Sequence, residues 1–145
     1  MSLLTVCNRI QDIVGASTLI NNAPHIEAWP TALNSADLPI ALTRPGAGSW
    51  PHDSIADIRG HRTYLTEVYV MPNAAGYYYE GIQTTLAIIQ DLGPRFAADF
   101  QLAGSSSALV FDSEPKDRGL VILNYSGTDY RGTVIELEVI EDVSG

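Results

Sequence analysis

The most metal-like cluster in the sequence lies in one short polar segment. His52, Asp53, Asp57 and His61 fall within ten residues of one another. Imidazole and carboxylate ligands suit zinc or manganese. Their spacing, however, matches no metal motif with a known mechanism, and His61 is expected to begin a strand. We therefore interpret these side chains as a solvated polar loop and predict neither a metal nor any other cofactor.

A catalytic triad and a dinucleotide loop are the next possibilities. Ser54, His25 and Asp57 could supply a nucleophile, a base and an acid, because triads are defined by geometry and not by order. No G-x-S-x-G elbow accompanies them. The run Gly46-Ala47-Gly48 has two glycines of a dinucleotide fingerprint, but the third is missing, and Ser49-Trp50-Pro51 opens no helix. Both segments are better explained as turns and loop.

Glu136 and Glu138 form a pair of carboxylates on one face of an expected strand. At the rise of a strand their Cα atoms stand about 7 Å apart, a spacing that could serve glycoside hydrolysis in a sugar cleft. They alternate with Ile135, Leu137 and Val139. That alternation already predicts a strand with one buried and one exposed face. We predict no catalytic residue, and hence no enzyme.

Composition restricts the partners. The 145 residues carry a formal charge of −9, with seven arginines and one lysine, Lys116, and no basic cluster that would grip phosphates. No apolar run approaches the roughly 20 residues of a membrane helix, and no export signal is evident at the N-terminus. A single cysteine, Cys7, excludes an internal disulfide and a multi-cysteine zinc site. These features predict one domain, 1–145, with a core of its own and no membrane partner.

Periodicity predicts an α+β fold: a single mixed or antiparallel sheet with two main helices packed on one face. The expected helices are 3–14 and 77–92, the second ended by Gly93-Pro94, with a further helical turn over 95–102. The expected strands are 26–29, 38–43, 61–71, 108–111, 119–125 and 130–140. A long loop is expected at 45–60, a linker at 104–107 and an acidic loop at 112–118.

Aromatic residues in exposed settings suggest contacts with other proteins. The loop over 45–60 carries Trp50, and loops of this length in compact domains are often functional. Tyr77-Tyr78-Tyr79 opens the second helix, where three consecutive residues cannot share one face. Tyrosine is enriched at interfaces, although a helix start with one core and two rim tyrosines remains the alternative.

The order of elements resembles the tail terminator proteins of long-tailed phages and of gene transfer agents. An amphipathic helix is followed by a strand ending in proline and a long polar loop. The segment Gly60-His61-Arg62-Thr63-Tyr64-Leu65-Thr66-Glu67-Val68-Tyr69-Val70 then leads to a helix. The chain closes on a hairpin running into Tyr130-Arg131-Gly132-Thr133-Val134-Ile135-Glu136-Leu137-Glu138-Val139. The resemblance covers nearly the whole chain and rests on no single motif.

The resemblance implies a structural subunit of the virion, assembled in the host cytoplasm and placed at the head-proximal end of the tail. Six copies would form a ring that stops growth of the tail tube and joins it to the head connector. It implies as partners the chain itself, the tube protein and the connector or adaptor protein, with DNA passing through the lumen. Six copies at −9 would carry about −54 before screening, which lets DNA slide without binding.

The resemblance transfers only regions, 45–59 and 130–140. The interface candidates within and beside them are Trp50, His52, Asp53, Arg59, Arg62, Tyr77, Tyr79, Tyr130, Arg131, Glu136 and Glu138. Two alternatives stay open. One is another head–tail joining or adaptor protein. The other is a small-molecule or metal-binding enzyme domain around His52, Asp57 and His61.

Overall fold

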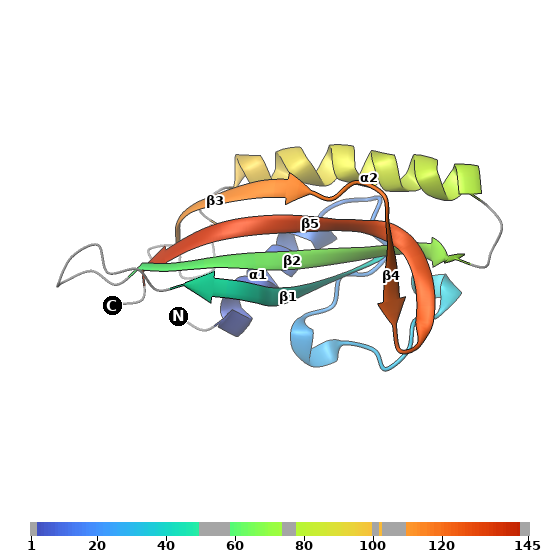
Figure 1. Ribbon diagram of the computed structural model, residues 1–145, viewed down its shortest axis with the longest axis horizontal. Coiled ribbons are helices and arrows are strands. Elements are labelled where there is room, and N and C mark those ends of the chain that lie inside the picture. Colours follow the sequence, from blue (N-terminus) through green and yellow to red (C-terminus); the bar gives the residue numbers. More distant parts are fainter. Residues whose placement is uncertain (1–2, 50–58, 74–77, 100–101, 103–109, 143–145) are drawn as a thin grey trace.

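The computed structural model of the protein describes residues 3–49, 59–73, 78–99, 102 and 110–142. Its five strands form one antiparallel sheet in the order β1-β2-β5-β3, with β4 also paired to β5. Figure 1 shows α1 and α2 lying on one side of this sheet. The predicted α+β class, with a single sheet and both main helices on one face, is confirmed. The elements are α1 (Leu3–Gly15), η1 (Ile26–Ala28), η2 (Ser35–Asp37), β1 (Ile40–Ser49), β2 (Arg59–Pro72), α2 (Tyr78–Ala98), β3 (Val110–Asp117), β4 (Val121–Tyr125) and β5 (Thr128–Asp142).

The main core lies between the sheet and the two helices. Alternation in β2 directs Tyr64 and Val68 toward the helices, and β5 contributes Leu137 to the same layer. From the other side, α1 buries Ile10 and α2 buries Leu92. Apolar residues spaced at two in the strands and at three or four in the helices therefore meet in one cluster.

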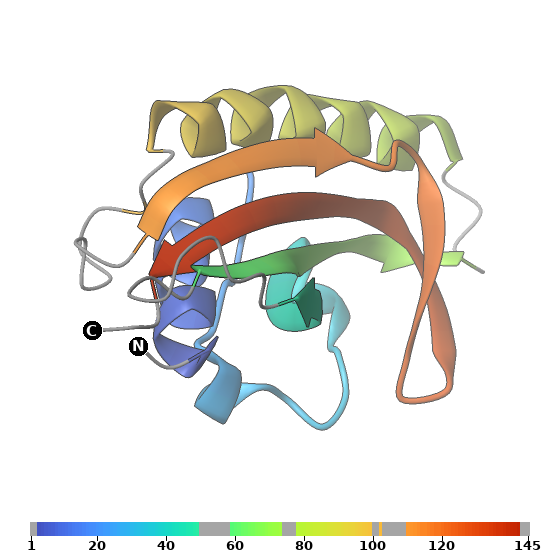
Figure 2. The same ribbon diagram turned by 60° about the vertical axis from the view of Figure 1, so that its left-hand side comes forward.

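The opposite face of the sheet is covered only in part. Leu42 of β1, Tyr69 of β2 and Tyr130 of β5 belong to a second apolar cluster there. Side chains of the segment before β1, among them Trp29 and Leu38, pack against this cluster. Figure 2 shows this segment on the side of the sheet away from α2, with the turn of the β4–β5 hairpin pointing the same way. Beyond this cluster, the described part of the face carries Thr63, Glu114 and Glu138 beside Ile140.

Two sequence predictions near the helices are wrong. The expected strand at 26–29 is the short helix η1, whose Ile26 N–H donates to the side chain of Asn8 on α1. The expected stop at Gly93-Pro94 does not occur, because α2 continues to Ala98. Proline inside a helix costs about 3 kcal/mol. The burial of Phe96 on the same helical face, completely out of solvent, offsets that cost.

Two loop predictions are also corrected. The segment 112–118, expected as an acidic loop, belongs largely to β3, which pairs with β5 through Asp117. Its charged residues fit a strand because Glu114 and Lys116, two residues apart, occupy exposed positions, while Ser113 before them is buried. The expected loop at 45–60 is shorter, since β1 extends to Ser49 and β2 begins at Arg59. The remainder of that loop, and the linker at 104–107, lie outside the described residues.

Thr133 of β5 places a hydroxyl group in the core. Its side chain is fully buried, and its hydroxyl has no hydrogen-bond partner among the described residues. Valine has the same shape without the polar atom, so Thr133→Val should raise the free energy of unfolding by about 1 kcal/mol. Urea denaturation followed by circular dichroism measures this. A loss of stability would show that the hydroxyl has a partner in the folded protein.

Within the described residues, no helix is both long enough and apolar enough to span a membrane.

Candidate functional site

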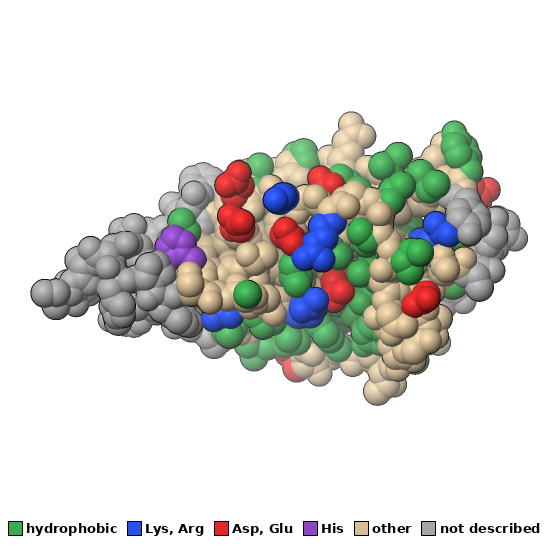
Figure 3. Space-filling view, viewed as in Figure 1, with side chains coloured by type: hydrophobic (Ala, Val, Ile, Leu, Met, Phe, Trp, Pro, Cys, Tyr) green, Lys and Arg blue, Asp and Glu red, His purple; other side chains and the backbone are tan. Residues whose placement is uncertain are grey.

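Exposed apolar side chains gather where α2 passes the β4–β5 hairpin. Leu120 and Ile122 are 50% and 58% exposed, and Leu86 of α2 is 51% exposed. Between α2 and β4 lies a cavity of about 240 Å³, lined by Gly81, Ile82, Thr85, Leu120, Val121, Ile122, Arg131 and Gly132. Figure 3 shows hydrophobic side chains at this end of the molecule. We call Tyr79, Ile82, Leu86, Leu120 and Ile122 together the α2–β4 surface.

The helix contributes to this surface through its spacing. Tyr79, Ile82 and Leu86 follow one another at three and four residues, which places them along one side of α2. The buried residues Ile88 and Leu92 occupy the side that faces the sheet. Tyr79 is 71% exposed, and its hydroxyl oxygen accepts a hydrogen bond from the Gln83 side chain. The helix thus has one apolar side in the core and a second, smaller one in solvent.

The hairpin contributes through a tight turn. Ser126 and Gly127 both have positive φ, 51° and 87°, as a two-residue turn with the twist of a hairpin requires. This turn sets the register of β4 on β5, with Tyr125 opposite Thr128 and Ile122 opposite Arg131. In that register Leu123 packs into the second apolar cluster. Ile122, one residue earlier, faces the other way and is exposed.

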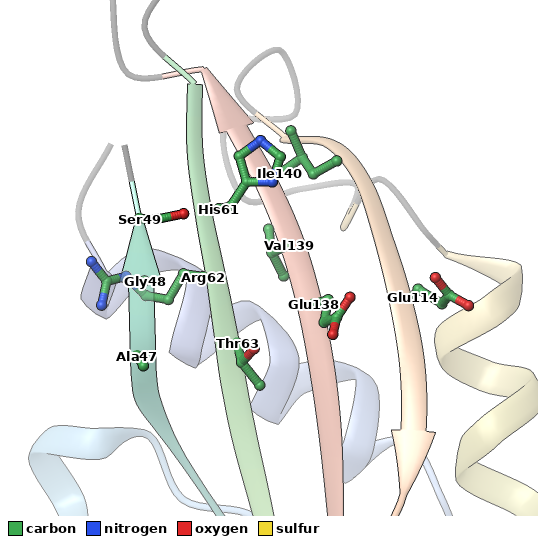
Figure 4. A pocket seen from close by; sticks show the side chains of 10 residues that line it. All are labelled: Ala47, Gly48, Ser49, His61, Arg62, Thr63, Glu114, Glu138, Val139 and Ile140. Carbon is green, nitrogen blue, oxygen red and sulfur yellow. The ribbon is translucent and has the colours of Figure 1, made fainter. Parts of the chain in front are cut away.

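A second hollow lies on the face of the sheet opposite the helices, near the start of β2. Its volume is about 390 Å³, and Figure 4 shows Glu114, Glu138, Thr63 and His61 around it. Glu114 and Glu138 are direct cross-strand partners. Like charges placed opposite each other weaken strand pairing. The described residues contain no group of three or more metal-ligating side chains, so this hollow has carboxylates and hydroxyl groups but no assembled metal site.

Ion pairs occupy the middle of the open face. Arg44 of β1 donates to Glu67 of β2 at 3.0 Å, and Arg118 donates to Glu136 of β5. Exposed pairs of this kind contribute little stability. Their main consequence is that Glu136 is compensated by an arginine, whereas Glu138 stands opposite another carboxylate.

Shifted pKa values belong to structural groups. Burial, and then the nearby Glu67 carboxylate, raises the pKa of Tyr69 above its usual range, so this phenol stays protonated. Its ring packs edge-on against Tyr125 and Tyr130. Hydrogen bonds from Ser17 and then Arg95 lower the pKa of Asp91 and keep it ionised. Neither group lines either cavity.

The predicted interface residues do not come together in one place. Tyr130 is 6% exposed and packs in the second apolar cluster. Arg62 is half-buried and donates to the Gly46 carbonyl at 2.9 Å. Tyr79 and Arg131 lie at the α2–β4 surface and its cavity, whereas Glu138 lines the open-face hollow and Glu136 pairs beside it. Trp50, His52, Asp53, Tyr77 and the side chain of Arg59 lie outside the described residues.

The structure describes only part of the hypothetical triad and of the metal-like cluster. Ser54 and Asp57 of the hypothetical triad, and Asp57 of the metal-like cluster, lie outside the described residues. His25 contacts Asp12 of α1 at 2.8 Å. The turn expected at Gly46-Ala47-Gly48 is an irregular part of β1, where the pairing with β2 shifts between Pro45 and Gly48.

Sequence reasoning missed Leu86, Leu120 and Ile122 as surface residues. The alternation within 121–125 was available as a signal, because it separates Ile122 from its neighbours Val121 and Leu123. This alternation could not show which of the two sets of side chains the rest of the chain would cover. No family model and no curated protein matches this chain.

Proposed function

We propose that this protein is a structural ring subunit of the tail-terminator type. It assembles with copies of itself, stops a tail tube and joins it to a connector, and it performs no catalysis. The observation that carries the proposal is the α2–β4 surface. The chain has a complete core between sheet and helices, yet it leaves large apolar side chains of two different elements exposed side by side.

Apolar patches on folded domains mark contacts with other proteins. Leu86, Leu120 and Ile122 are each about half exposed in the isolated chain, so burying them in an interface would release apolar area from water. The sheet with helices on one face agrees with the α+β subunit that the sequence resemblance implies. The net charge of −9 suits a lumen through which DNA moves without binding.

Native mass spectrometry and negative-stain electron microscopy of the purified protein test the ring. We expect a hexamer at high protein concentration. Leu86→Lys should raise the concentration needed for assembly at least tenfold, because a buried lysine charge lacks compensation in an apolar contact. Leu4→Lys is the matched control, since Leu4 is a similarly exposed leucine, 46%, on α1. A tight closed dimer, or a monomer at every concentration, would contradict the proposal.

A further inference from the structure

Residues 29–38, which we call the strap, cover part of the second apolar cluster without a buried centre of their own. Trp29, Leu33 and Leu38 pack against that cluster but are only half-buried themselves. The preceding helix η1 has no buried residue, and residues 29–34 form neither helix nor strand. Segments open locally most easily where few apolar side chains are fully buried. The strap therefore has little apolar burial to hold it closed.

A single hydrogen bond joins the strap to the sheet. The Tyr125 hydroxyl, at the end of β4, donates to the Pro30 carbonyl. Among the described residues, the other hydrogen bonds of the strap stay within the connection from α1 to β1. Figure 1 shows the strap, in light blue, passing beside the turn of the hairpin. Burial raises the pKa of Tyr125, so the phenol stays protonated and keeps this donor.

The closed position of the strap has a polar cost. The indole Nε1 of Trp29 is buried and has no hydrogen-bond partner among the described residues. A buried donor without an acceptor costs free energy, and that cost is relieved when the strap lifts and the indole N–H meets water. The apolar ring of Trp29 thus favours closure, whereas its N–H opposes it.

We propose that the strap is a cover that opens while the rest of the fold stays intact, and that the Tyr125 hydroxyl is the latch that holds it closed. Opening breaks the hydrogen bond to Pro30 and uncovers Leu42 and its apolar neighbours on the sheet. The main core between sheet and helices, where α1 buries Cys7, takes no part. Because Tyr125 ends the strand that carries Ile122, the latch connects the strap to the α2–β4 surface.

Thiol labelling of the purified protein compares opening on the two faces of the sheet. Leu42→Cys places a thiol in the cluster that the strap covers, at a position that is 1% exposed. Cys7, the single native cysteine, is buried and reports openings of the main core. Excess maleimide and peptide mass spectrometry give both rates, each divided by its rate in the unfolded protein. We expect the Leu42→Cys thiol to react about tenfold faster than Cys7, or more, because the strap lifts without global unfolding.

Tyr125→Phe in the same background isolates the latch. It keeps the ring and removes only the hydroxyl, so labelling at position 42 should become about fivefold faster, the equivalent of one neutral hydrogen bond, with Cys7 unchanged. Tyr130→Phe is the matched control. Tyr130 packs edge-on against the same Tyr69 ring as Tyr125 does. Among the described residues its hydroxyl makes no hydrogen bond to the strap.

Equal labelling rates at position 42 and at Cys7 would overturn the inference, because the strap would then open only with the whole fold. An unchanged rate in Tyr125→Phe, an equal gain at Cys7, or an equal gain in Tyr130→Phe would show that the hydroxyl is not the latch. The labelling rates are properties of the isolated subunit. Their outcome therefore does not depend on whether the protein forms rings.

Discussion

Gly132→Ala should destabilise the protein by about 3 kcal/mol or more. Gly132 lies in β5 opposite Tyr69, beside the irregular pairing between Tyr69 and Met71 of β2. A Cβ atom on Gly132 would stand 1.7 Å from the Val68 carbonyl oxygen. That oxygen belongs to the backbone of the central strand pair, so relief requires the two longest strands to separate. The change in midpoint of urea unfolding, with the slope held constant, measures the effect.

Two other glycines provide matched controls for Gly132. Gly93→Ala should stabilise α2 by up to about 1 kcal/mol, because nothing lies within 4 Å of the added Cβ and alanine favours the helix. Gly81→Ala meets the Met71 sulfur, which can move with its flexible side chain, so its cost should be well below that of Gly132→Ala. If all three variants had the same stability, the close approach of the Val68 carbonyl oxygen would be excluded as the reason for glycine at position 132.

Gln11→Met should cost about 3 kcal/mol, although methionine has a similar shape. Gln11 is a residue of α1 and is 1% exposed, on the buried side of that helix. Its side-chain amide donates to the carbonyls of Pro24 and Ala41, each at 2.7 Å. Its carbonyl accepts from Thr43, which in turn contacts Thr66 at 2.9 Å. Methionine would leave the buried Ala41 carbonyl and the partly buried Pro24 carbonyl without this donor, and each lost partner costs on the order of 1–3 kcal/mol.

Thermal unfolding and urea titration of Gln11→Met check this expectation. Gln90 of α2 offers the control, because it is an exposed glutamine on a helix, and Gln90→Met should change stability by less than about 0.5 kcal/mol. An unchanged midpoint for Gln11→Met would mean that the carbonyls find other partners. The amide of Gln11 ties together α1, the segment before β1 and β1 itself, so loss of this link should also increase amide exchange in residues 21–24.

Periodicity within one segment was enough to predict the elements whose packing repeats regularly. The stripe Val6, Ile10 and Val14 marks α1, and the alternation of Ile135, Leu137 and Val139 with glutamates marks β5. These patterns state which side chains must be buried and which must be exposed. They therefore also give the fold class, since a sheet with one apolar face and two amphipathic helices have few ways to bury those faces.

Boundaries depended on contacts that no local pattern contains. The helix α2 passes Pro94 because Phe96, beyond it, reaches the core. Residues 26–28 do not form a strand, since their nearest partners are polar groups of α1 and not another strand. The charged segment 112–117 becomes β3 because β5 offers a partner edge whose open face accepts charge. In each case the deciding contact joins the segment to residues far away in sequence.

The sequence by itself determined the layers of this protein: which faces are apolar, how acidic the chain is, and where α1 begins. The tertiary structure decided the surface, because exposure depends on what the rest of the chain covers. Tyr130 is buried by Tyr69 and Leu123, whereas Ile122, an equally apolar residue of the same hairpin, is left in solvent. Pro45 and Pro115 lie at outward positions of β1 and β3 only because strand pairing directs them there, and no described strand other than β5 pairs with β4.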